Sequence, residues 1–301
     1  MKAKKILWII IFNSIIILSE IIFGIISNSF ALIADALHNA GDVIAIMITY
    51  IALKLGVKKT TFKYTFGFIK AEMMAAFTNT LFLFVTMIYM IYEAINRFYK
   101  PEVIEPIYMI VVGIIAVFAN GISAYILNNL GVDSCPNHEH HHHEDANIKS
   151  AYLHMLSDAL ISVGVVLAGI FIYYFKIYYI DSILTIIFSI YIILHSYPLL
   201  KKSFLSLMDI NIVDISQEKL DKIIKSDENV LEYNDLHIHK PSSKHTFISF
   251  HIVLVQDLLL SECENITNKI KQDLEAIGFN HILIQVDTNS CLKNHTNCDM
   301  T

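Results

Sequence analysis

The sequence predicts a multi-span α-helical membrane protein with six transmembrane helices, followed by a cytosolic α+β domain with a ferredoxin-like fold. Three observations predict this class. Hydrophobic residues make up 55% of the 301 residues. Charged residues make up 17%, whereas soluble domains contain about 25%. The apolar residues are gathered in long runs before Lys201, and charges return after it.

Six apolar runs are long enough to cross about 30 Å of hydrocarbon, for which a helix needs about 20 residues. They cover residues 6–27, 30–53, 72–96, 105–128, 150–174 and 179–199. The N-terminal side carries eleven cations: Lys2, Lys4, Lys5, Lys54, Lys58, Lys59, Lys63, Lys70, Lys149, Lys201 and Lys202. The loops on the other side carry only Arg97, Lys100 and Lys176. Because positively charged loops stay in the cytosol, both termini are expected there, with residues 1–203 forming the membrane domain.

The expected cytosolic domain covers residues 204–290, and residues 291–301 form a short tail. Its pattern predicts the order helix, strand, strand, helix, strand, over 216–226, 230–240, 246–255, 262–277 and 281–288. Every second residue from Ile248 to Leu254 is apolar, as expected for a half-buried strand. Helices on one face of a small sheet would complete the domain.

Charge and cysteine content exclude other classes. The net charge is −6 and the sequence has no basic patch, which argues against nucleic acid as a partner. The four cysteines are scattered, so a dense disulfide framework is excluded. The first apolar run has no small-residue cleavage site, and we therefore expect no cleavable signal peptide.

Two predicted spans carry the same pair of ionisable residues. The second contains His38 and Asp42, and the fifth contains His154 and Asp158. Residues four apart lie on one helix face, and ionisable residues inside a span are costly and usually functional. Because the two spans run in opposite directions, His38 would lie level with Asp158, and Asp42 with His154. Two nitrogens and two oxygens would then converge.

Such a set suits a borderline cation such as Zn²⁺ in tetrahedral coordination. The structural alternative is that each His–Asp pair is a satisfied buried polar contact, but its repetition on two spans favours a metal site. Asp35, three residues before His38, is expected to support the site or the helix end, and is a candidate additional ligand. Glu20 in the first span is either a helper carboxylate near the outer opening or a packed polar contact.

The same residues suggest an energy source for transport. Metal binding requires neutral imidazole and ionised carboxylate, and histidine titrates near neutral pH. Protons arriving from outside would compete with the metal and help to expel it, and the inward-facing state would release them to the cytosol. We therefore hypothesise metal–proton antiport by alternating access.

Residues 29–42 and 154–158 resemble the two membrane motifs of the cation diffusion facilitators, in the form typical of the zinc-preferring branch. Residues 235–238 and 281–287 resemble that family's cytosolic domain. The resemblance covers nearly the whole chain. It implies a homodimeric secondary transporter, not an enzyme, that exports Zn²⁺, and in some members Cd²⁺ or Co²⁺, in exchange for protons. We expect it in the bacterial inner membrane.

The resemblance also implies metal binding in the cytosolic domain. Four residues match the family's binding positions there: His237, His251, His281 and Asp287. His239 is a candidate additional ligand. Metal loading would clamp the two cytosolic domains of a dimer together and favour one conformer; alternatively, these histidines are ordinary surface residues. The loop at 54–71 contains no His, Asp, Glu or Cys, so we expect no metal site in it.

Two further segments are rich in metal-ligating residues. The loop at 135–146 contains five histidines: His138, His140, His141, His142 and His143. We interpret it as a flexible collector of metal on the cytosolic side, with a solvated linker as the alternative. Cys291, His295 and Cys298 either bind a soft metal ion in a reducing cytosol or have no role.

Two other classes of function compete with a transporter. A membrane metalloenzyme could hydrolyse a substrate at an open metal position, but the sequence contains no His-Glu-x-x-His pair or nucleophile motif. A metal sensor or storage protein would use the spans only as an anchor. An anchor needs no ligands inside two spans, so the sequence favours a transporter.

Overall fold

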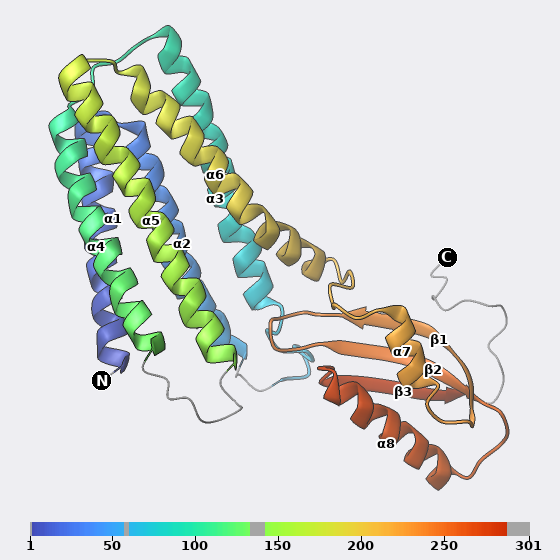
Figure 1. Cartoon of the computed structure of the whole chain (residues 1–301). Coiled ribbons are helices and arrows are strands. Elements are labelled where there is room, and N and C mark those ends of the chain that lie inside the picture. Colours follow the sequence, from blue (N-terminus) through green and yellow to red (C-terminus); the bar gives the residue numbers. More distant parts are fainter. Residues whose placement is uncertain (1, 57–59, 133–141, 288–301) are drawn as a thin grey trace. The chain divides into compact units, whose positions relative to one another are not determined.

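A computed structural model describes residues 2–56, 60–132 and 142–287 (Figure 1). The chain forms two compact units. The first comprises Met1–Met47 and Asn79–Pro198, and the second comprises Ile48–Thr78 and Leu199–Thr301. The first unit is helical, whereas the second contains a small sheet together with the adjoining ends of three long helices.

The described residues before position 208 form six long helices. They are α1 (Lys2–Ser27), α2 (Phe30–Gly56), α3 (Ala71–Tyr99), α4 (Pro106–Val132), α5 (His142–Phe175) and α6 (Tyr179–Leu207). Among the described residues, four segments are long and apolar enough to cross a membrane: Ala71–Tyr99, Pro106–Tyr125, Met155–Phe175 and Tyr179–Leu207. Each predicted span coincides with one helix, and six membrane crossings remain a prediction.

A buried carboxylate from α6 caps the start of α2. Asp181 Oδ1 accepts hydrogen bonds from Ser29 Oγ at 2.6 Å and from the Ala31 N–H at 3.3 Å. Its Oδ2 accepts the Phe30 N–H at 3.0 Å. The first N–H groups of a helix have no partner within the helix, so Asp181 satisfies donors that would otherwise be buried and unpaired.

Arg97, near the end of α3, joins the same turn. It donates two hydrogen bonds of 2.6 Å, to the backbone oxygen and to the side-chain oxygen of Asn28. Its Nη1 lies 3.7 Å from Asp181 Oδ2, and its guanidinium carbon lies 3.4 Å from the centroid of the Phe30 ring. The turn between α1 and α2 is therefore tied to both α3 and α6.

Glycines allow α4 and α5 to pack closely. A Cβ atom at Gly113 would lie 2.8 Å from Cγ2 of Val166, and one at Gly169 would lie 2.8 Å from Cγ1 of Ile110. Small residues let membrane helices approach in this way. This contact holds α5, which carries the second His–Asp pair, against its neighbour.

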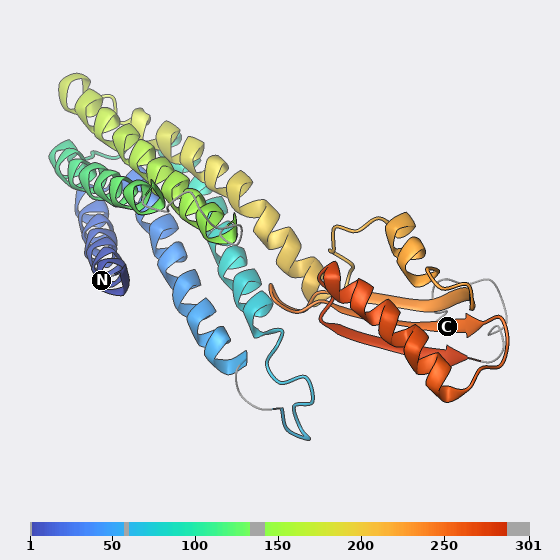
Figure 2. The ribbon, with the colours of Figure 1, turned by 60° about the horizontal axis from the view of Figure 1, so that its bottom comes forward.

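The second unit contains a three-stranded sheet with two helices on one face. Its elements are α7 (Gln217–Ile224), β1 (Val230–His239), β2 (Phe247–Leu254), α8 (Leu260–Ala276) and β3 (His281–Asp287). The strand order is β1-β2-β3, with β1 antiparallel and β3 parallel to β2 (Figure 2). The predicted order of elements is confirmed, and the ferredoxin-like assignment remains a prediction.

The core of this domain lies between the sheet and its two helices. Its buried residues are Leu220, Ile224, Val230, Tyr233, Ile248, Phe250, Ile252, Ile266, Ile270, Leu274 and Phe279. The predicted alternation in β2 is confirmed, because Ile248, Phe250 and Ile252 point into this core. The residues that alternate with them, Ser249, His251 and Val253, are not part of this core.

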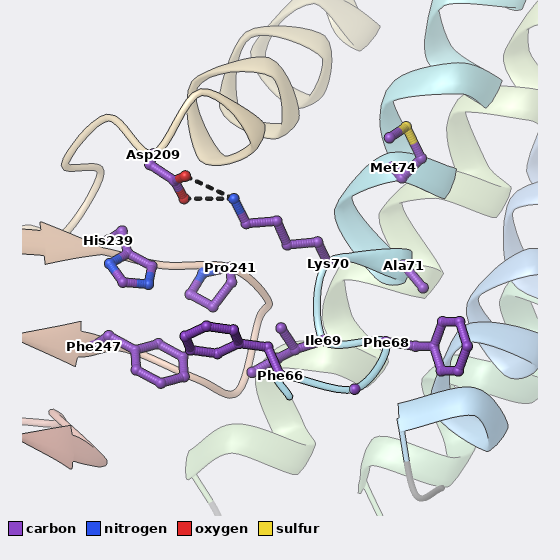
Figure 3. A pocket seen from close by; sticks show the side chains of 11 residues that line it. Phe66, Phe68, Ile69, Lys70, Ala71, Met74, Asp209, His239, Pro241 and Phe247 are labelled. Carbon is purple, nitrogen blue, oxygen red and sulfur yellow. Dashed lines mark hydrogen bonds and ion pairs between the residues drawn. The ribbon is translucent and has the colours of Figure 1, made fainter. Parts of the chain in front are cut away.

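An ion pair in the second unit joins the residue before α3 to the segment that follows α6. Lys70 Nζ lies 2.7 Å from both carboxylate oxygens of Asp209. A cavity of about 590 Å³ lies beside this pair and is lined by aromatic residues and His239 (Figure 3). Phe66, in the segment before α3, contacts Phe247 of β2 edge-to-face at 6.1 Å.

Candidate functional site

The structure brings together three of the four residues that the sequence predicts to bind the transported ion. His38 Nε2 on α2 lies 3.8 Å from Asp42 Oδ2, one turn along the same helix. It also lies 3.8 Å from Asp158 Oδ1 on α5. His38 and Asp158 are 4% and 2% exposed, and Asp42 is partly exposed. One imidazole and two carboxylates, from two helices, therefore lie close together in the first unit.

These separations are close to those of a tetrahedral metal site. Zinc–ligand bonds of about 2.0–2.1 Å place the ligand atoms about 3.4 Å apart. Among the described side chains, however, no group of three or more His, Cys, Asp or Glu residues is arranged so that it could hold a metal ion. His154 lies on α5 one turn before Asp158, but its side chain lies outside the described set. The fourth predicted ligand is therefore untested.

A polar contact from α3 supports α2 at this point. Asn79 Nδ2 donates a hydrogen bond of 3.1 Å to the backbone oxygen of Gly41. Nearby, Leu83 and Met87 of α3 form a buried apolar cluster with Ile192 of α6. Asn79 thus holds the backbone of α2 immediately before Asp42.

Asp35 and Glu20 lie in a neighbouring polar group. Asn39 Nδ2 is 3.4 Å from Asp35 Oδ1 and 3.5 Å from Glu20 Oε2. Ser162 Oγ donates to Asp35 Oδ2 at 3.2 Å and to the backbone oxygen of Asp158 at 3.0 Å. Asp35 therefore contacts neutral donors beside the His38 group, and Glu20 is linked to it through Asn39.

A second group of histidines and carboxylates lies on the sheet. His251 of β2 contacts two carboxylates: its Nδ1 is 2.9 Å from Asp287 Oδ2 of β3, and its Nε2 is 3.6 Å from Asp235 Oδ2 of β1. His237 Nε2 is 3.6 Å from Asp235 Oδ1. Asp235, which sequence reasoning did not include as a ligand, therefore links His237 to His251, and His251 in turn contacts Asp287.

Asp235 takes part because β1 is irregular. The register of β1 against β2 shifts between Asn234 and His237, and Asp235 has φ 56°. A bulge redirects side chains, and aspartate tolerates the left-handed region better than most residues. An Asn-Asp pair within a strand pattern is a sequence signal of such an interruption.

His281 lies apart from this group. It begins β3, whereas Asp287 ends it, and six residues of strand correspond to about 20 Å. The His281 ring contacts Phe247 with centroids 4.5 Å apart. The His239 ring stacks on the same phenylalanine at 4.9 Å and 2°, and Figure 3 shows His239 and Phe247 at the cavity. The predicted cytosolic set thus divides into two groups, one around His251 and the other around Phe247.

The stacked histidine gives a pH prediction. Burial lowers the pKa of His239, and the nearby Lys70 acts in the same direction while Asp209 opposes it. Below the ordinary histidine pKa, the unfolded chain then binds more protons than the folded one, so stability falls as pH falls. His239→Phe keeps a ring on Phe247. We expect its melting temperature to fall less than that of the wild type between about pH 7.5 and about pH 5.5; equal decreases would contradict this.

The remaining predicted ligands lie outside what the structure describes. Residues 138 to 141 and the tail with Cys291, His295 and Cys298 fall outside the described residues. His142 and His143 lie in α5, but their side chains are outside the described set. The collector loop and the thiol site therefore stay predictions.

Comparison with known protein families shows the family to which the chain belongs. Residues 6–208 match the cation efflux transmembrane domain, and residues 212–289 match the cytoplasmic domain of cation efflux proteins. The chain belongs to the cation diffusion facilitator family. As a member, this facilitator is an integral membrane transporter with a cytosolic C-terminal domain, as the sequence predicts.

Relatives of this facilitator are named as transporters, antiporters and efflux proteins. The cadmium, cobalt and zinc/H(+)-K(+) antiporter of Bacillus subtilis is 36% identical over 278 residues, 92% of this chain and 86% of the relative. The zinc transporter ZitB of Pectobacterium atrosepticum is 32% identical, covering 78% and 70%. The metal cation efflux system protein CzcD of Cupriavidus metallidurans is 30% identical, covering 91% and 83%.

Proposed function

We propose that this facilitator exports divalent metal cations from the cytosol in exchange for protons, with Zn²⁺ preferred and Cd²⁺ and Co²⁺ accepted. The observation that carries the proposal is the position of His38, whose Nε2 lies 3.8 Å from one carboxylate on its own helix and from another on α5. The names of the relatives, which include zinc, cadmium and cobalt, support the choice of metals.

The proposed transport site consists of His38, Asp42, His154 and Asp158. Two imidazoles and two carboxylates suit a borderline ion, whereas four carboxylates would favour harder ions. Two carboxylates neutralise a divalent charge, so the loaded site would be electrically neutral in the membrane interior. Neutrality lowers the cost of holding an ion in a low-dielectric medium.

Proton coupling follows from the chemistry of the same ligands. A histidine must be neutral to bind metal, so protons reaching the outward-facing site would displace the ion. We propose six membrane spans with both termini in the cytosol of a bacterial cell, a homodimer, and alternating access at a fixed midplane site. The match to the cytoplasmic domain of cation efflux proteins supports the dimer.

The cytosolic domain would bind metal as a regulator. Asp235, His237, His251 and Asp287 supply two imidazoles and two carboxylates that are linked by contacts of 2.9–3.6 Å. These are ligand types that Zn²⁺ takes, although the described arrangement would have to close further around an ion. Metal at this position would favour one conformer of the transporter. The loop at 135–146 would collect metal, and Cys291, His295 and Cys298 would add a soft site.

Asp235 gives a direct test of the cytosolic site. Asp235→Asn keeps the size and the left-handed tolerance of the residue but removes the charge shared by His237 and His251. We expect weaker zinc binding at the cytosolic site, by about tenfold or more by analogy with supporting carboxylates, as measured by titration calorimetry. Asp257→Asn, an exposed substitution after β2, is the matched control. Equal affinities would remove Asp235 from the site.

Purified protein in liposomes tests the whole function. An imposed pH gradient, acidic on the side opposite the cytosolic domain, should drive Zn²⁺ movement that stops when the gradient is collapsed. A metalloenzyme would instead turn over a substrate without moving zinc, and an anchored storage protein would bind zinc without moving it. Either result would overturn the proposal.

A further inference from the structure

Glu20 of α1 is buried and poorly paired. The residue is 0% exposed, and its Oε2 accepts a single long hydrogen bond of 3.5 Å from Asn39 Nδ2. Among the described residues, Glu20 Oε1 has no hydrogen-bond partner. An ionised carboxylate buried without compensation is very costly, and such a group normally binds a proton instead. Neither the metal site nor the packing of α1 explains this residue.

Two other carboxylates lie near Glu20: Asp35 on α2 and Asp158 on α5. His38, the basic group of the site, is engaged with Asp158 and Asp42. The described part of α4, which packs against α1, carries no Asp, Glu, His, Lys or Arg between Pro106 and Tyr125. Among the described side chains of these helices, no lysine or arginine offsets the charge of Glu20.

Asp35 is the better satisfied of the two carboxylates. It accepts hydrogen bonds on both oxygens, from Asn39 and from Ser162, whereas Glu20 accepts on one. Of this pair, Glu20 is thus the group that gains more from a proton. Hard metal cations such as Ca²⁺ take about 6–8 oxygen ligands. Among the described residues, no group of three or more His, Cys, Asp or Glu residues could hold a metal ion, so Glu20 suits a proton and not a second metal ion.

We propose that Glu20 carries the proton that is exchanged for the metal, at a position separate from the metal ligands. When a divalent ion enters between His38 and Asp158, its positive charge favours the ionised Glu20, and the carboxyl group releases its proton. When Glu20 binds a proton again, the metal site loses a neighbouring negative charge and holds the ion less tightly. This inference rests on the proposed function.

Glu20→Gln tests the proposal in liposomes that contain a pH indicator. We expect the variant to bind zinc in detergent at fixed pH, but to lose the proton movement that accompanies zinc and the response of zinc flux to an imposed pH gradient. Glu105→Gln, which neutralises an exposed carboxylate before α4, should behave as the wild type does. Glu20→Asp, which keeps a titrating group, should restore part of the coupling.

The outcomes separate this inference from the proposed function. If the wild type moves no zinc, the proposed function fails. If the wild type exchanges zinc for protons and Glu20→Gln keeps the same number of protons per zinc, the inference fails. The inference also fails if zinc movement depends on a K⁺ gradient and Glu20→Gln abolishes only that dependence, because Glu20 would then act on K⁺ and not on the proton.

An infrared measurement tests the inference without transport. Adding zinc to the wild-type protein should remove the absorption of a protonated carboxyl group, and this change should be missing in Glu20→Gln. If Glu20→Gln does not fold, Glu20→Asp decides, because the band should shift in that variant. A carboxyl band that is absent from the wild type, or unaffected by zinc, would overturn the proposal.

Discussion

Asp158→Asn is expected to reduce zinc transport by more than about a hundredfold. Removing groups that only support a metal ligand costs about 10–100-fold in affinity or activity, and Asp158 is proposed as a ligand itself. Its Oδ1 lies 3.8 Å from His38 Nε2, and the residue is 2% exposed. The asparagine variant keeps the shape but leaves a divalent ion with one carboxylate, so the loaded site would carry a net positive charge inside the membrane.

Zinc uptake into liposomes under a fixed pH gradient measures this effect, with Asp42→Asn run alongside. Ser157→Ala is the matched control, because Ser157 precedes Asp158 but its hydroxyl donates to the backbone oxygen of Leu153. We expect the control to transport at the wild-type rate. If Asp158→Asn transports zinc at the wild-type rate, Asp158 is not a ligand of the transported ion.

The positions of the long helices could be predicted because burial in lipid demands a continuous apolar run. The runs at 72–96 and 179–199 correspond to α3 (Ala71–Tyr99) and α6 (Tyr179–Leu207). The His38/Asp158 contact was predictable for a related reason. The spacing of four fixes a helix face, and two antiparallel helices bring equivalent faces together.

Contacts set by tertiary structure could not be predicted in the same way. Asp235 joins the histidines of the sheet only because a bulge in β1 turns it towards them. His281 is six residues from Asp287 on one strand, so its separation from the His251 group follows from the strand length and parallel pairing. A family motif names residue types, but it does not give the register that decides which of them meet.

The buried contacts that hold the turn between α1 and α2 involve residues that periodicity does not mark. Asp181 is 152 residues from Ser29 in the sequence, and Arg97 is 69 residues from Asn28. Neither residue belongs to a repeated motif. Asp181 lies in the first turn of α6, where an acidic residue is ordinary. Its function as the cap of α2 becomes visible only when the helices are assembled.

Asp181→Ala is expected to destabilise the membrane domain by about 3–5 kcal/mol, the usual cost of breaking a buried ion pair by removing one partner. Asp181 is 0% exposed and accepts hydrogen bonds from Ser29 Oγ and from the N–H groups of Phe30 and Ala31. The substitution would leave these donors unpaired and would leave the Arg97 guanidinium, 7% exposed, without its buried carboxylate.

Denaturant unfolding in mixed micelles measures the loss, and Glu102→Ala provides the control on the same arginine. Glu102 Oε2 lies 3.4 Å from Arg97 Nη2, but its side chain is 56% exposed, so its removal should cost about 0–1 kcal/mol. Because the cap fixes the start of the helix that carries His38, Asp181→Ala should also weaken zinc binding in the protein that remains folded. Equal stability losses for the two variants would mean that burial of Asp181 contributes nothing to holding α2.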